Sequence, residues 1–426
     1  MRIEQLTLQN FRGIKSLTLD FSESLNVLGG INGAGKSSIL DALAILLSWY
    51  SARIRRENTP GRSLTEIDIQ NEESYSTLQV RVRVNEKSIS WRQVKTRPGR
   101  QKGNQSDYSE LNSCVKTMQQ RLEESQGNVS VPVLVYYPVN RSVVDIPLRI
   151  KTKHNFDDPL SAYDDDGGSL TSGSNFRVFF EWFREIEDLE NEKKAEYFDM
   201  PEQPNPLTPI RQLEAVRTAI TTFTGFQDLR IRRQPLRMEL KKGNESLRVE
   251  QLSDGEKCLL AVVGDLARRL AIANPGKDPF SGSGIVLIDE VELHLHPQWQ
   301  RMIIQNLQKT FRNCQFIVTT HSPQILSHVD GKNIFLLHKV DNEGITCKKP
   351  IDSYGISSDR ILEDLMDVSA RPDDIKQELE NIFRLIDNNE LARAESAITR
   401  IRSQIGEDPE LVKANALIRR KRLIRK

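Results

Sequence analysis

The chain has 426 residues, enough for one large domain or two to three ordinary ones. Its 60 basic and 59 acidic residues nearly cancel, so only local clusters of charge can argue for a nucleic-acid partner. The four cysteines lack any C-x-x-C spacing, which argues against a disulfide scaffold and a zinc site. The N-terminus has no apolar signal-peptide core, and no apolar run approaches the roughly 18 residues of a membrane span. We therefore expect a cytoplasmic protein with no membrane partner.

The first part of the chain alternates apolar and polar residues, as strands with one solvated face do. This pattern predicts strands over residues 3–9 and 15–21, joined by a tight connection in which Gly13 permits the turn. A short apolar run at 24–28 predicts a buried strand, and residues 38–47 predict a helix.

The segment between that strand and helix, Gly30–Ser37, fits the phosphate-binding pattern G-x-x-x-x-G-K-[ST] at every fixed position. Its glycines let backbone N–H groups approach a polyphosphate, and the dipole of the following helix favours the negative charge. Lys36 can reach the β- and γ-phosphates, and Ser37 can offer its hydroxyl to Mg²⁺. We expect ATP to be bound by Asn32, Gly33, Ala34, Gly35, Lys36, Ser37 and Ser38.

Residues 77–137 continue the regular pattern. Alternation predicts an antiparallel sheet near residues 77–84 and 88–94, then a loop at 97–108, a helix at 109–125 and a buried strand at 131–137. The regular pattern ends after residue 140. Residues 141–225 read as a mainly helical insertion whose apolar stripe, between Phe179 and Ile186, packs into a core. Asp164–Asp166 precede glycines without a following acidic ligand, which favours a solvated loop over a metal site.

Regular elements return from about residue 208. The patterns predict helices at 208–222, after Ser253 and at 297–310, and strands near 228–233, 236–240, 285–288, 315–320, 333–338 and 344–348. Beyond Tyr354 only helices are expected, over 358–366, 373–387, 390–405 and 409–425, as a small appendage. The basic end of this appendage, 418–426, is either a solvated helix end or a contact to the phosphates of a nucleic acid. A second candidate for a phosphate contact is the loop with Arg92, Lys95, Arg97, Arg100 and Lys102.

Two acids follow the apolar run Ile285–Ile288. A buried strand that ends there would deliver Asp289 beside Ser37 to hold Mg²⁺, and Glu290 would polarise the attacking water. The run and its acids match the Walker B pattern of nucleotide hydrolases.

The segment Leu252–Lys257 resembles the signature motif of ABC-type ATPases, Leu-Ser-Gly-Gly-Gln in its common form. Asp254 replaces the first glycine and Glu256 the glutamine, while Ser253 and Gly255, the expected nucleotide contacts, are kept. By itself the segment is also an ordinary helix cap. The family's signature motif contacts nucleotide held by a partner's P-loop, so the resemblance implies a homodimer, or a higher oligomer, with ATP sandwiched between the heads.

Further motifs extend this resemblance. His321, after a strand, resembles the switch histidine that senses the γ-phosphate, and Asn10–Ile14 resembles the NFRG opening of SMC, RecF and Rad-fifty-like ATPases. There Arg12 would approach the nucleotide. His294 and His296 belong to a stretch resembling the D-loop of the RecF- and OLD-like branch, and a zinc site is disfavoured by their spacing. Asn140 and Arg141 lie where the Q-loop residue would fall.

The predicted fold class is therefore α/β, an ABC-ATPase-like P-loop head with a mixed sheet, an antiparallel β subdomain, a helical insertion and a C-terminal helical appendage. The predicted domains are residues 1–140 (N-terminal lobe), 141–225 (insertion), 226–352 (C-terminal lobe) and 353–426 (partner-binding region). No long heptad array and no TOPRIM-type acidic clusters are present, which sets the chain apart from SMC, RecN and complete OLD proteins.

The compact size and residues 353–362 and 408–412 resemble the family "predicted ATP-binding protein involved in virulence". That family is similar to PtuA, the ATPase of Septu anti-phage systems, which works with a separate HNH nuclease, PtuB. The resemblance implies an ATPase that controls a nuclease docked on the C-terminal region. Two alternatives stay open: a RecF-like repair ATPase that clamps DNA, and a scaffold that binds ATP with little turnover.

Overall fold

The computed structural model describes residues 1–99, 105–125, 128–139, 158–163, 168–170, 176–199, 209–275, 278–340 and 344–424. The chain divides into two compact units, Met1–Ile356 and Ser357–Lys426. The six-stranded sheet of the first unit takes strands from both predicted lobes of the head, so those lobes share one sheet.

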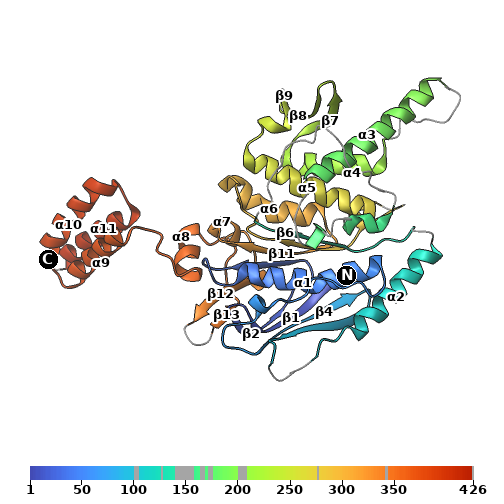
Figure 1. Ribbon diagram of the computed structural model, residues 1–426. Helices are drawn as coiled ribbons and strands as arrows, with labels where there is room; N and C mark the ends of the chain where they lie inside the picture. The colour runs from blue at the N-terminus through green and yellow to red at the C-terminus, as the bar shows by residue number, and fades with distance from the viewer. Residues whose placement is uncertain are drawn as a thin grey trace. The chain divides into compact units, whose positions relative to one another are not determined.

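The described elements follow the predicted order (Figure 1). The strands are β1 (Arg2–Phe11), β2 (Ile14–Asp20), β3 (Leu25–Gly29), β4 (Tyr75–Val84), β5 (Lys87–Thr96), β6 (Val133–Tyr137), β7 (Gln227–Arg233), β8 (Leu236–Lys242), β9 (Glu245–Arg248), β10 (Gly284–Ile288), β11 (Cys314–Thr320), β12 (Ile334–Val340) and β13 (Gly344–Lys348). The helices are α1 (Lys36–Arg55), α2 (Ser109–Glu124), α3 (Phe176–Asp199), α4 (Arg211–Thr224), α5 (Asp254–Ala273), α6 (Pro297–Thr310), α7 (Pro323–Leu326), α8 (Ser358–Arg360), α9 (Asp373–Asp387), α10 (Leu391–Ile405) and α11 (Pro409–Ile424).

The six-stranded sheet has the order β13-β12-β3-β11-β10-β6. Its strands are parallel except for β13, which pairs antiparallel with β12. Every residue of β3, β6, β10 and β11 is buried, because helices cover both faces, and this explains why these strands appear in the sequence as short continuous apolar runs.

A second, antiparallel sheet with the order β2-β1-β4-β5 forms the predicted β subdomain. Its alternating strands bury one face. Helix α1 contacts strands of both sheets and lies between them (Figure 1). The run from Ala42 to Tyr50 is therefore buried on every side, and the indole Nε1 of Trp91 in β5 donates to the carbonyl of Leu46 at 2.9 Å. The mixed sheet and the antiparallel subdomain confirm the predicted α/β class.

The helical insertion packs against α5 through α3 and α4. The aromatic stripe of α3 is buried as predicted, at Phe179, Phe180, Trp182 and Phe183. The three-stranded sheet β7-β8-β9 follows. Its last strand, Glu245–Arg248, was not predicted, because four mostly polar residues leave no periodicity to detect.

The second unit has its own small core, formed by α9, α10 and α11. Leu379, Ile382, Ile398, Ile401 and Leu411 are among its buried residues. Its role in partner binding stays a prediction. Within the described ranges, no helix combines the length and the apolar character that crossing a bilayer requires. Asn140, Arg141, Asp164–Asp166, Arg100 and Lys102 lie outside the described residues.

Candidate nucleotide-binding site

The candidate site lies where neighbouring strands of the six-stranded sheet end. β3 leads into the P-loop, β10 into Asp289 and Glu290, and β11 into His321, and these strands are adjacent in the order β3-β11-β10. The carboxyl ends of parallel strands share one edge of the sheet, so residues up to 285 positions apart meet there.

The P-loop is shaped by its glycines, and two of them, Gly30 and Gly35, have no room for a side chain. Gly33 and Gly35 have φ of 78° and 88°, in the left-handed region that glycine adopts readily. A Cβ on Gly35 would clash with the side chain of Ile345, and one on Gly30 would lie 2.5 Å from the carbonyl oxygen of Leu337. The β12–β13 hairpin therefore packs directly against the loop, and α1 begins at Lys36.

Lys36 is almost fully buried, and its ammonium group lies within the curve of the P-loop. It donates to the carbonyl oxygens of Gly30 and Ile31, both at 2.8 Å, and lies 3.2 Å from Nδ1 of His321. An ammonium group can only donate, so Nδ1 accepts and a neutral imidazole carries its proton on Nε2. That nitrogen lies 3.5 Å from Oε1 of Glu290. The lysine, the histidine and the glutamate thus form one chain of polar contacts.

The charge of Lys36 is sensitive to this environment. Burial lowers the pKa of Lys36 to about 8, although the carboxylates of Asp289, Glu292 and Glu290 oppose this shift. A triphosphate bound in the loop would add negative charge beside the amine and raise its pKa again. Nucleotide binding should therefore be coupled to proton uptake above pH 8.

Asp289 is buried, and its Oδ1 atom accepts two hydroxyl donors. Ser37 donates to it at 3.1 Å and Thr319 at 2.5 Å. A serine hydroxyl and one carboxylate suit Mg²⁺, which keeps several waters and completes its octahedron with substrate phosphates. The residues present therefore fit the metal, and Ser37 and Asp289 would hold it. No group of three or more potential metal-ligating side chains occurs within the described ranges, His294 and His296 included.

Glu290 has a φ of 45°, which is uncommon for a residue with a side chain. Its backbone N–H donates to the hydroxyl of Thr319 at 2.7 Å, the same hydroxyl that donates to Asp289. The backbone N–H of His321 donates to Glu292. Thr319 and Glu292 thus orient the Walker B acids and the histidine, a role that sequence patterns did not reveal.

Arg12 is placed at the edge of the P-loop helix rather than in the loop. Its guanidinium pairs with Asp41 of α1 and with Asp68, to which Nε donates at 3.0 Å. Arg62 pairs with the other oxygen of Asp41 at 2.8 Å. Burial acts to lower the pKa of Arg12, but Asp41 and Asp68 outweigh it and the pKa is raised. Arg12 is therefore permanently charged and already partnered in this state.

Ser253 and Gly255 contact their own lobe. Ser253 is the N-cap of α5 and forms a capping box with Glu256, to which its hydroxyl donates at 2.9 Å. Lys242 of β8 holds the same glutamate at 2.6 Å. A Cβ on Gly255 would clash with the backbone carbonyl of His294, so the signature segment packs directly on the D-loop stretch. Ser253 itself is exposed.

Comparison with known proteins identifies the family of the chain. The family model described as "RecF/RecN/SMC N terminal domain" matches residues 2–345. The "Retron Ec83 probable ATPase" of Escherichia coli is 34% identical over 88% of this chain and 78% of its own length. The "Retron Vc95 probable ATPase" of Vibrio cholerae is 32% identical over 80% and 74%. "Septu protein PtuA" of Bacillus thuringiensis is 25% identical over 85% and 84%. The chain is an ATP-hydrolysing enzyme, and it belongs to the RecF/RecN/SMC N-terminal domain family.

Proposed function

We propose that this chain is the ATPase subunit of a bacterial anti-phage defence complex, and that its nucleotide state controls a partner HNH nuclease. The linked cluster of Lys36, Ser37, Asp289, Glu290 and His321 carries the enzymatic part of the proposal. The defence role is supported by relatives named for Septu and retron systems. The HNH partner rests on the resemblance to Septu ATPases.

In this mechanism the P-loop amides and Lys36 stabilise the charge of the phosphates. Lys36 would exchange its bonds to the carbonyls of Gly30 and Ile31 for phosphate oxygens. Glu290 accepts a hydrogen bond from the attacking water and aims it, while His321 fixes the glutamate and senses the γ-phosphate. Mg²⁺, when bound by Ser37 and Asp289, neutralises charge that develops on the phosphates.

The ATP sites are proposed to be shared between two copies of the chain. The residues of the P-loop cluster all come from one copy of the chain. Ser253 is exposed and caps the start of α5 within its own lobe. A helix N-terminus favours an anion, and the hydroxyl of Ser253, which donates to Glu256 within the chain, would donate instead to the γ-phosphate held by a second head. Hydrolysis would then control how long two heads stay together.

Glu290→Gln tests the enzymatic claim. We expect the variant to lose about 10²-fold or more in phosphate release, because the amide cannot act as a base towards water. ATP binding, measured by calorimetry, should stay within a few-fold of wild type. If wild type and variant release phosphate equally slowly, the chain is a scaffold that binds ATP without turnover.

The partner claim is tested by co-purification. The product of the adjacent reading frame should contain an HNH core and bind the full chain. A chain ending at Ile356, which keeps the whole first compact unit, should still bind ATP but lose the partner. A neighbour without an HNH core, or undiminished binding to the shortened chain, would contradict the nuclease assignment or the docking region, respectively.

A further inference from the structure

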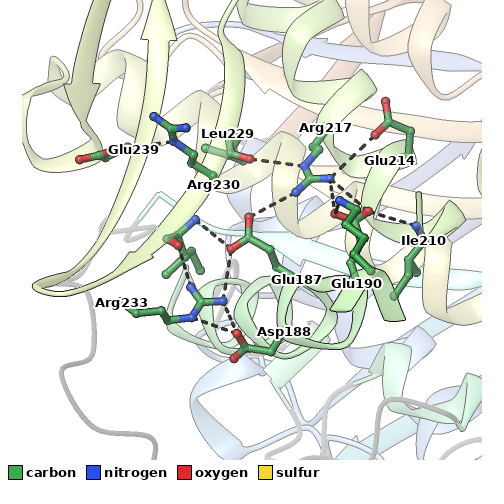
Figure 2. Close-up of polar contacts among 12 residues, drawn as sticks. Glu187, Asp188, Glu190, Ile210, Glu214, Arg217, Leu229, Arg230, Arg233 and Glu239 are labelled. Atoms are coloured by element: carbon green, nitrogen blue, oxygen red, sulfur yellow. Dashed lines mark hydrogen bonds and ion pairs between the residues drawn. The ribbon is translucent and has the colours of Figure 1, made fainter. Parts of the chain in front are cut away.

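The arginines on the two sides of the β7–β8 hairpin are neutralised very differently. On the side facing α3 and α4, Arg217 contacts Glu187 and Glu190, both at 3.2 Å (Figure 2). Arg233 contacts Glu187 at 3.3 Å and also Asp188. Carboxylates outnumber arginines there, and the network ties α3 to α4 and β7 as a structural brace.

The opposite, solvent-facing side of the same sheet is dominated by cations. Cross-strand pairs place Arg230 and Arg248 on either side of Glu239, and Arg232 directly opposite Arg237. We call this surface the arginine face, and it consists of Arg230, Arg232, Arg237, Lys241 and Arg248.

Among the described residues, two carboxylates form ion pairs with the arginine face. Glu239 is shared by Arg237 at 2.5 Å, Arg232 at 3.1 Å and Arg230 at 3.8 Å. Asp228 pairs with Lys241 at 2.5 Å. These residues together carry a net positive charge, and the side chains of Arg230 and Arg232 are 42% and 49% exposed.

Fold stability does not explain this arrangement. Surface ion pairs contribute about 0–1 kcal/mol, and one carboxylate cannot compensate three arginines that repel one another. Like charges directly opposite on neighbouring strands, as in Arg232 and Arg237, are destabilising. A cluster of like charges that lowers the stability of the fold points to an anionic ligand.

The chemistry of the surface favours a phosphate backbone over an acidic protein. Protein interfaces have an apolar or aromatic centre from which charges are depleted. Within residues 227–248, all of them described, no large hydrophobic side chain is exposed. Arginine forks on neighbouring strands instead match the repeated phosphates of a nucleic acid.

We propose that the arginine face binds the phosphate backbone of a nucleic acid, independently of base sequence. The sheet continues through β9 and a short turn into the capped start of α5, and Lys242 of β8 contacts Glu256 of the signature segment. Nucleic acid on this face would therefore lie next to a part of the ATP machinery. The inference does not rest on the nuclease partner.

The test uses the full-length chain and a fluorescein-labelled oligonucleotide of mixed sequence, followed by fluorescence anisotropy at increasing KCl. Arg232→Gln/Arg248→Gln should weaken binding by about tenfold or more and reduce the slope of log K against log[salt] by about two, because two phosphate contacts are lost. Basal ATPase activity without nucleic acid should be unchanged, which also verifies folding. Arg83→Gln/Lys332→Gln removes the same charge from exposed positions elsewhere in the first unit and should change the affinity less than twofold.

Three outcomes would overturn the proposal. The first is wild-type protein without salt-dependent binding. The second is an equal loss in both double variants, or a loss that appears instead in Arg419→Gln/Arg420→Gln on α11. The third is displacement of the oligonucleotide by polyglutamate as effectively as by unlabelled oligonucleotide, which would identify an acidic protein as the ligand.

Discussion

The P-loop and the signature segment lie in the same unit but are built in opposite ways. Around the P-loop, Lys36 and Asp289 are buried, and their polar atoms contact the P-loop backbone, the start of α1 and residues at the end of β11. The signature segment is an exposed helix start whose serine contacts only its own first turn. The first region is preorganised for a polyphosphate within one chain, whereas the second is an exposed surface that a second chain can reach.

The largest effect on phosphate release is expected when the P-loop is inactivated in one copy of the chain and the signature segment in another, and the two variants are then mixed. Lys36→Ala should abolish ATP binding, and Ser253→Arg should leave ATP binding intact but remove the serine that would contact the γ-phosphate held by the other head. Each variant alone should release almost no phosphate. An equal mixture should recover about a quarter of wild-type activity, because half of the dimers are mixed and each has one intact site of two.

The mixture is measured by steady-state phosphate release, with each variant at doubled concentration as the control. A mixture as inactive as its components would indicate that the sites do not combine residues from two copies.

A smaller effect is expected where the signature segment packs on the D-loop. Gly255→Ala would force a methyl group into the carbonyl of His294. We expect phosphate release to fall about tenfold and unfolding to become about 1–3 kcal/mol easier, while ATP binding by the P-loop changes little. Gly13→Ala is the control, since its methyl would meet Ile345 at an ordinary 3.6 Å. Equal losses in both variants would disprove a specific role for this contact.

A change of pH should have a smaller effect than these substitutions, and it should act on ATP binding through the P-loop region alone. Burial lowers the pKa of Lys36 to about 8, so the ammonium form that binds phosphate is depleted above that pH. Affinity should be constant below about pH 7.5 and fall by at most tenfold for each further unit above 8.

Calorimetry in two buffers of different ionisation enthalpy should detect proton uptake on ATP binding near pH 8.5, half a unit above the pKa of about 8. Lys36→Arg is the matched control, because guanidinium stays charged and should give a flat profile. An unchanged slope in that variant would assign the titration to another group.

The sequence predicted what is encoded locally. The P-loop pattern, the apolar run before Asp289 and the Ser253–Glu256 cap each occupy a few consecutive residues, and the structure contains all three. Contacts between distant segments were not predictable in this way. The hydroxyl of Thr319 bridges Asp289 and the backbone of Glu290 only because β10 and β11 are neighbours in register, and no spacing in the sequence encodes that register.

Arg12 illustrates the same limit. Its motif resembles one whose arginine approaches the nucleotide, yet the side chain pairs with Asp41, which lies 29 positions away in the sequence. The motif identifies the residue, while its partner depends on how the antiparallel sheet packs on α1. The role of Arg12 in nucleotide binding therefore stays a prediction.

The smallest effect is expected from the Arg12–Asp41 pair, and it decides whether Arg12 belongs to the P-loop region. Both side chains are partly exposed, so a double-mutant cycle of Arg12→Gln and Asp41→Asn should give a coupling energy of about 1 kcal/mol in chemical unfolding. If the pair only joins the sheet to α1, Asp41→Asn should alter ATP affinity less than threefold. We expect this result because Asp68 would still hold the guanidinium. A tenfold gain in affinity would instead mean that Asp41 competes with the nucleotide for Arg12, and the preorganised region would then include a residue that must change partners before ATP can bind.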